Sequence, residues 1–264
     1  MTKININDIT VNYKMEGEGK TIVFVHGLSD NLNYWDILTN ELKDDYQVLS
    51  YDLRGHGESS DDDRKTTIDL YQEDLYQLLN ALKIENALFI GLSLGGNIIL
   101  DLAVNHPEKV NGLLVMSSFS QQSERLSKIF KDFEESIDKG FIEFFDTILP
   151  YTLTEEMLEE HREILENLKW EAAKVANIEG IKKGIKAGNG FNITDRLNEI
   201  DVPALVIAGK EDNLTDLETQ KIISNNIRDS KLIVLDDTKH NLLIGSNIGE
   251  ILDIINDFML KIDQ

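Results

Sequence analysis

Short hydrophobic runs that do not alternate with polar residues recur along this 264-residue chain, with helical patterns between them. A strand exposed on one face alternates apolar and polar residues, so these continuous runs predict strands buried on both faces. Such strands form a mostly parallel central sheet with helices on both faces. The predicted strands are Thr21–Val25, Gln47–Tyr51, Ala87–Leu92, Val110–Met116, Ala204–Gly209 and Lys231–Leu235. The predicted helices are Trp35–Leu42, Ile68–Leu82, Gly95–Asn105, Leu217–Ile227 and Ile248–Lys261.

Two segments depart from this pattern. Residues 2–15 alternate apolar and polar positions around Asn7-Asp8, which predicts an antiparallel N-terminal hairpin at one edge of the sheet. Residues 119–194 hold no convincing strand and predict an all-helical cap inserted after the strand ending near Met116. Its helical patterns cover Leu126–Asp138, Phe141–Leu149, Thr154–Leu168 and Glu171–Ala187, with Thr154 as an N-terminal cap. We therefore expect a core domain of residues 1–118 and 195–264 and a helical cap of residues 119–194.

The net charge of −22 disfavours two classes of partner. A strongly negative surface repels phosphate backbones and anionic lipid, so we expect neither nucleic acid nor membrane partners. The chain has no cysteine, which excludes disulfides, thiolate metal sites and cysteine nucleophiles. The N-terminus lacks the apolar region of a signal peptide, and no run approaches the ~18 apolar residues of a membrane span. These features predict a cytoplasmic protein.

The motif Gly91-Leu92-Ser93-Leu94-Gly95 lies where a predicted strand turns into a predicted helix. In this setting G-x-S-x-G is typical of a serine nucleophile held at the tip of a sharp turn. Flanking glycines avoid collisions at such a turn, and the helix N-terminus favours a developing anion. The motif predicts that Ser93 is a nucleophile.

A serine hydroxyl needs a base, and the base needs a carboxylate on its other ring nitrogen. His240 follows the last predicted strand, at the same sheet edge as Ser93, and is the predicted base. Asp212 follows the strand before it and is the predicted acid, with Glu211 and Asp216 as nearby alternatives. His106 and His161 are expected to be solvated.

The oxyanion of a tetrahedral intermediate needs two backbone N–H donors. Leu94 directly follows the nucleophile, and Leu28 lies in the loop after Thr21–Val25, so their amides are the predicted oxyanion hole. His26 in that loop is expected to order the neighbouring backbone. The segment Asp52–Ser59 lacks a Walker lysine and is interpreted as a structural turn. In that turn we expect Asp52 to pair with Arg54 and His56 to make local hydrogen bonds.

Together these motifs resemble the α/β-hydrolase superfamily, in its branch with a helical cap. The resemblance covers nearly the whole chain and is closest to small microbial carboxylesterases, enol-lactonases and cofactor-free haloperoxidase-type members. It implies a triad of Ser93, Asp212 and His240, an oxyanion hole at Leu28 and Leu94, and no cofactor or metal. A serine nucleophile implies acyl transfer, whereas dehalogenases and epoxide hydrolases of this fold use aspartate.

The leading hypothesis is therefore a serine esterase that cleaves a small to medium uncharged ester or lactone. One alternative keeps the triad but acts on an amide, a C–C bond or an elimination substrate. The elimination substrate is multiply anionic and would need cap arginines, of which there are only Arg125 and Arg162. Another alternative is a slow-turnover ligand receptor of the same fold.

Nine of the 19 aromatic residues fall within residues 119–194. Two interpretations remain open. The aromatic side chains form a small core of the cap itself, or some of them line a substrate pocket beneath it. The candidates for the pocket are Phe141, Phe144, Phe145 and Trp170.

Overall fold

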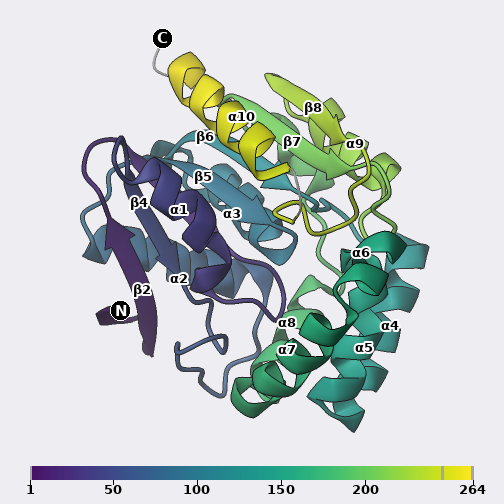
Figure 1. Cartoon of the computed structure of the whole chain (residues 1–264). Coiled ribbons are helices and arrows are strands. Elements are labelled where there is room, and N and C mark those ends of the chain that lie inside the picture. Colours follow the sequence, from purple (N-terminus) through teal and green to yellow (C-terminus); the bar gives the residue numbers. More distant parts are fainter. Residues whose placement is uncertain (1, 245–246, 263–264) are drawn as a thin grey trace.

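The computed structural model describes residues 2–244 and 247–262 and contains an eight-stranded sheet (Figure 1). Its strand order is β1-β2-β4-β3-β5-β6-β7-β8. The pairs β1–β2 and β2–β4 are antiparallel, and every later pair is parallel. This confirms the predicted mostly parallel sheet with an antiparallel hairpin at one edge. The strands are β1 (Thr2–Ile6), β2 (Ile9–Glu16), β3 (Thr21–Val25), β4 (Gln47–Tyr51), β5 (Ala87–Leu92), β6 (Val110–Met116), β7 (Ala204–Gly209) and β8 (Ser230–Leu235).

Helices connect most of these strands. They are α1 (Asp36–Leu42), α2 (Ile68–Ala81), α3 (Leu94–Asn105), α4 (Glu124–Lys139), α5 (Phe141–Thr152), α6 (Glu155–Glu160), α7 (Arg162–Val175), α8 (Ile178–Gly188), α9 (Leu217–Asn226) and α10 (Asn247–Ile262). Short 3-10 helices cover Leu32–Trp35, Pro107–Lys109 and Thr194–Glu199.

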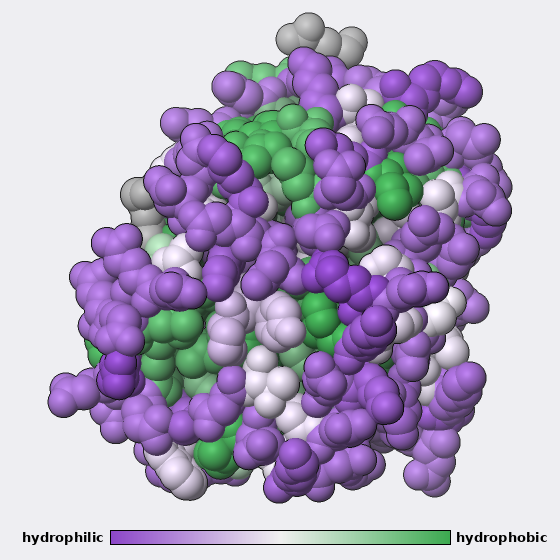
Figure 2. All heavy atoms as spheres, turned by 90° about the vertical axis from the view of Figure 1, so that its right-hand side faces the viewer, coloured by the Kyte–Doolittle hydropathy of each residue, from purple (hydrophilic) through white to green (hydrophobic). Residues whose placement is uncertain are grey.

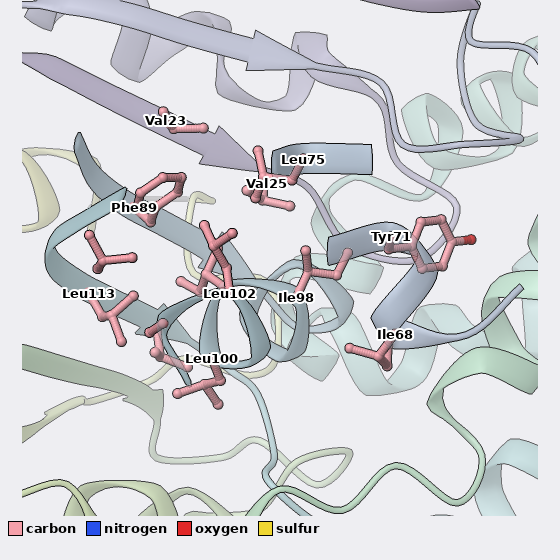
Figure 3. Close-up of a cluster of buried hydrophobic side chains, with 14 of the residues drawn as sticks. Val23, Val25, Ile68, Tyr71, Leu75, Phe89, Ile98, Leu100, Leu102 and Leu113 are labelled. Atoms are coloured by element: carbon pink, nitrogen blue, oxygen red, sulfur yellow. The ribbon is translucent and has the colours of Figure 1, made fainter. Parts of the chain in front are cut away.

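Successive side chains of each strand point to opposite faces, and both faces are covered. On one face Val23 and Val25 pack with α2, α3 and α9, and Figure 3 shows side chains of α2 and α3 gathered against β3, β5 and β6. On the other face Ile22 and Phe24 pack with α1 and α10. Because both faces are buried, the central strands β3, β5, β6 and β7 are apolar over nearly their whole length, which is the pattern that the sequence carries.

The hairpin between β1 and β2 turns at Asn7 and Asp8. Both residues have positive φ, 43° and 65°, the left-handed backbone of a two-residue turn whose twist matches the strands. Asparagine and aspartate tolerate this conformation better than other non-glycine residues. The alternation of the strands and the residues of the turn therefore specify the same hairpin.

Residues 119–194, called the helical insertion below, carry α4 to α8, which lie together at one end of the molecule (Figure 1). Thr154 caps α6 as predicted, since its hydroxyl accepts from the Met157 amide at 3.3 Å. Two predicted helices are wrong in extent. The pattern Thr154–Leu168 is split at His161 into α6 and α7, and Glu171–Ala187 is interrupted before α8. The second break occurs because the Asn177 side chain accepts from the Gly180 amide and starts a new helix there. The division into two domains stays a prediction.

Hydrophilic side chains cover most of the face shown in Figure 2, with smaller hydrophobic areas between them. Within residues 2–244 and 247–262, no helix is both long enough and apolar enough to cross a bilayer. The cytoplasmic location stays a prediction.

Candidate active site

Ser93 lies at the turn between β5 and α3 with φ 52° and ψ −112°. This conformation is rare for a non-glycine residue and marks a strained position of the kind found at functional sites. The flanking glycines permit the turn. A Cβ on Gly91 would lie 2.5 Å from the Gly95 carbonyl oxygen, and one on Gly95 would lie 2.1 Å from the Val25 carbonyl oxygen. The predicted reason for the flanking glycines is therefore confirmed.

His240 and Asp212 meet at the carboxyl edge of the sheet although 28 positions separate them. Nδ1 of His240 lies 2.9 Å from Oδ2 of Asp212, and both side chains are buried. The Leu214 and Thr215 amides donate to Oδ1 of Asp212 at 2.8 and 2.9 Å, which holds the carboxylate in place. Of the two alternative acids, Asp216 instead caps α9 and Glu211 is exposed.

Ser93 and His240 line one cavity together with Leu28 and Leu94. Within the described chain, the Ser93 hydroxyl makes no hydrogen bond to His240, and the Leu28 and Leu94 amides have no protein acceptor. Catalytic hydrogen bonds are often long before substrate binds and shorten in the complex. The two unengaged amides leave donors available to a ligand in this cavity.

The loop that carries Leu28 is held in place by His26. Nδ1 of His26 lies 2.8 Å from the Gly27 carbonyl oxygen, and Nε2 accepts from the Leu53 amide at 3.0 Å. A neutral imidazole protonated on Nδ1 satisfies both contacts. Burial, aided by neighbouring His56, lowers the pKa of His26 to about 3, so the ring stays neutral. The predicted ordering role of His26 is confirmed.

The turn after β4 is structural, but the predicted pair of Asp52 with Arg54 is wrong. Asp52 accepts from the Leu32 amide, the Asn12 side chain and the Glu58 amide, each at 2.8 Å. Arg54 pairs instead with Asp74 and Asp62. Two residues so close in sequence have different partners because Asp52 faces the Leu32 amide and β2, whereas Arg54 faces Asp74 on α2. His56 makes the expected local contact, with Nδ1 3.0 Å from the Arg54 carbonyl oxygen.

The cavity has a volume of about 330 Å³, enough for a small ligand, and most of its lining is apolar. Phe141, Phe144 and Phe145 line it as predicted, and Phe141 and Phe144 also belong to the buried core of the helical insertion. These aromatic residues therefore form the core of the insertion and also line the cavity, and their contact with a substrate stays a prediction. Trp170 is a correction. It lies outside this lining, 55% exposed, because its indole N–H donates to Glu166 at the surface.

Comparison with known proteins agrees with this fold. Residues 20–246 match the family model described as alpha/beta hydrolase fold. The chain belongs to this family.

Several known proteins resemble the chain over most of its length. A putative carbamate hydrolase RutD of Agrobacterium fabrum is 28% identical over 96% of this chain and 98% of its own. The 3-oxoadipate enol-lactonase 2 of Acinetobacter baylyi is 28% identical, covering 88% of this chain and 87% of its own. The solved structure of an N-acyl homoserine lactone degrading enzyme has a TM-score of 0.84 at 28% identity and covers 97% of this chain and 100% of its own.

In this α/β hydrolase the helical insertion contacts both loops that carry the predicted acid and base. The last carbonyl groups of α5 have no partner inside the helix. Those of Tyr151 and Thr152 accept from the amides of His240 and Asn241 at 3.4 and 3.1 Å. Arg125 at the start of α4 donates to the Leu214 carbonyl and pairs with Asp216 at 2.9 Å.

Two residues at this site of the hydrolase were not predicted from the sequence. The Thr215 hydroxyl donates to Oδ2 of Asp212 at 2.8 Å and lies 3.2 Å from Nδ1 of His240. The spacing Asp-x-x-Thr after a strand is a signal for such a turn, in which aspartate accepts from residues two and three positions on. Asp30 lines the cavity. The one signal for it in the sequence is its position two residues after Leu28.

Proposed function

We propose that this chain is a serine hydrolase that cleaves small to medium uncharged carboxylic esters or lactones through an acyl-enzyme. One observation carries the proposal. Ser93, held at a strained turn, and His240, bound to Asp212, line a single, mostly apolar cavity. A nucleophile, an oriented base and an apolar binding volume are the parts that ester hydrolysis needs. Similarity to an enol-lactonase and to a lactone-degrading enzyme supports the same reaction class.

The reaction begins when the Ser93 hydroxyl attacks the substrate carbonyl and Nε2 of His240 takes its proton. Asp212 stabilises the imidazolium through Nδ1, and the Leu28 and Leu94 amides bind the oxyanion. His240 then gives the proton to the departing alcohol oxygen, which leaves an acyl group on Ser93. In the second half His240 removes a proton from water, and the water oxygen attacks the acyl carbon. The bond between Oγ of Ser93 and the acyl carbon breaks, the carboxylic acid leaves, and His240 returns the proton to Oγ.

The lining of the cavity argues against a multiply anionic substrate. No lysine or arginine lines it in the part of the chain that the structure describes. Both arginines of the helical insertion are engaged elsewhere, Arg125 with the acid turn and Arg162 with Glu159. The described cavity lining therefore offers no lysine or arginine to bind the anionic groups of an elimination substrate.

A carbamate is the second candidate substrate, because a putative carbamate hydrolase resembles the chain over 96% of its length. Ser93 would attack its carbonyl carbon while His240, oriented by Asp212, takes the hydroxyl proton. His240 would then give that proton to the amine nitrogen, which leaves in place of the alcohol. An ester and a carbamate with the same acyl-side volume, assayed side by side, distinguish the two reactions.

Steady-state hydrolysis of p-nitrophenyl esters of increasing acyl length tests the proposal. Ser93→Ala should lower kcat by roughly 10⁴–10⁶ and leave the fold intact. Ser127→Ala, which removes the exposed hydroxyl of a serine on α4, is the matched control and should behave as the wild type. Near-normal activity of Ser93→Ala would refute the assignment. A wild type without turnover that binds these esters would favour the receptor alternative.

A further inference from the structure

The cavity wall carries few titratable side chains. Among the described lining residues, only Asp30 and His240 are titratable, and the helical insertion contributes mainly aromatic and aliphatic side chains. The remaining polar side chains of the lining are Ser29, Asn31, Ser93, Asn97, Thr152 and Asn241. A carboxyl group without a cationic partner is unusual in such a setting and needs an explanation.

Asp30 lies beside the predicted oxyanion hole. Its amide donates to the Gly27 carbonyl oxygen at 3.4 Å, which closes a turn around Leu28. A Cβ added to Gly27 would lie 3.3 Å from Oδ2 of Asp30 and 3.5 Å from the Leu92 carbonyl oxygen. The carboxyl group is therefore next to the residues that precede Leu28 and Ser93. No hydrogen bond reaches it from any residue that the structure describes.

Asp30 lines the same cavity as His240 and Asn241, which places it on a wall shared with the predicted base. Burial raises the pKa of Asp30 to about 7, and the charge of His240 partly opposes this shift. The other titratable group beside it is Tyr34, whose hydroxyl donates to Asn241 at 2.8 Å. In the proposed reaction the His240 ring must reach the departing oxygen, so the leaving group lies near this wall.

We propose that Asp30 is a specificity-determining residue that binds a hydrogen-bond donor on the leaving-group side of the substrate and rejects a carboxylate there. The inference rests on the proposed function and names its substrate class, neutral esters or lactones that carry a hydroxyl or amide N–H close to the scissile bond. An unpartnered carboxyl in an apolar cavity gains from a donor. Above its pKa of about 7 the Asp30 carboxylate also repels a second carboxylate, because no positive charge compensates the pair. A hydrogen bond of this kind corresponds to a preference of roughly tenfold to a hundredfold.

Three esters of one acyl group, with leaving groups of similar size, test this inference at about pH 8, above the pKa of Asp30. They are the 2-hydroxyethyl ester, which offers a donor, the propyl ester, which offers none, and the carboxymethyl ester, which brings a carboxylate. The wild type should prefer the hydroxyethyl ester by kcat/KM. Asp30→Leu should abolish that preference. Asp30→Asn should keep it, because its carbonyl oxygen still accepts, but should lose the discrimination against the carboxymethyl ester.

Asp63→Asn is the matched control, because it removes one negative charge from an exposed loop residue. Its three kcat/KM ratios should equal those of the wild type. Thermal unfolding of each variant establishes that it is folded before the ratios are compared. Wild-type ratios in a folded Asp30→Leu would overturn the inference.

A binding experiment separates this inference from the proposed function. Dissociation constants of the three esters are measured for Ser93→Ala and for Ser93→Ala combined with Asp30→Leu. Loss of the donor preference in the double variant supports the role of Asp30 even if the wild type hydrolyses none of the esters, which would refute only the proposed function. Hydrolysis by the wild type, with affinity ratios that Asp30→Leu leaves unchanged, refutes only the role of Asp30.

Discussion

The hydroxyl of Thr215 donates a 2.8 Å hydrogen bond to Oδ2 of Asp212. The same oxygen contacts Nδ1 of His240 at 2.9 Å. The Leu214 and Thr215 amides bind the other carboxylate oxygen, Oδ1. Both oxygens of Asp212 therefore accept hydrogen bonds that do not involve His240. The orientation of the imidazole in this hydrolase therefore depends on a side chain that lies outside the described cavity lining.

Thr215→Val removes this hydroxyl while keeping the shape of the side chain. We expect kcat to fall about tenfold with little change in KM, because one hydrogen bond to a charged group is lost behind the base. Thr215→Ser keeps the hydroxyl and should retain most of the activity. A purely structural role would instead lower the unfolding temperature of Thr215→Val and leave kcat unchanged.

His26 should make the protein sensitive to acid. Its pKa is about 3 in the folded chain and ~6.5 when unfolded. Between these values, falling pH protonates the unfolded state only, so the free energy of unfolding decreases as pH falls below about 6.5. His26→Gln should be less stable at pH 7 but lose less stability between pH 7 and pH 4.5. Urea unfolding at both pH values measures this, with the exposed His161→Gln as control. An equal loss of stability in His26→Gln and the wild type would contradict the prediction.

Phe145 and Trp170 form a matched pair of aromatic residues in the helical insertion. Phe145 lines the cavity and is half-buried, whereas Trp170 is exposed outside it. Phe145→Ala should shift the preference between short and long acyl esters by about 1–3 kcal/mol, because apolar contact with the substrate is lost. Trp170→Ala should leave this ratio unchanged. If Phe145→Ala lowers only the unfolding temperature, its side chain is core and not a specificity contact.

Phe144 combines both roles, since it is fully buried in the core of the insertion and also lines the cavity. Phe144→Ala should therefore lower the free energy of unfolding by about 3–5 kcal/mol and also shift the acyl-length ratio. Chemical denaturation and the ester series measure the two effects separately. An unchanged ratio in the destabilised variant would restrict Phe144 to the core.

Asp30 should destabilise the folded chain at neutral pH. Its folded pKa of about 7 lies above the value of ~3.9 for an unfolded aspartate, so between these values the unfolded state loses a proton that the folded state keeps. The free energy of unfolding thus falls as pH rises through this window. Asp30→Asn should be as stable as the wild type near pH 4 and more stable above pH 7. Equal unfolding temperatures at pH 8 would show that the carboxyl group is well solvated.

Prediction from sequence succeeded where a local pattern carries the information. Strands β3 to β7 have the predicted bounds. Their mainly apolar runs coincide with the strands, because the strands are buried on both faces. The positions of Ser93 and the flanking glycines followed from the strand-turn-helix motif. Prediction failed where the partner lies far along the chain. Arg54 binds Asp74 rather than Asp52, and Trp170 points to solvent although its aromatic neighbours line the cavity.

The sequence by itself determined the order of strands and helices, the family resemblance and the choice of the predicted nucleophile, base and acid, because periodicity and short motifs are properties of consecutive residues. Only the tertiary structure decided which side chains share the cavity. In the tertiary structure Thr215 donates to Asp212, the Tyr151 carbonyl of the insertion accepts from the His240 amide, and Asp30 lies on the cavity wall. These contacts depend on the order of the strands in the sheet and on the packing of the insertion. Hydrogen bonds and burial bring together residues that are far apart in the sequence, and a local pattern does not report them.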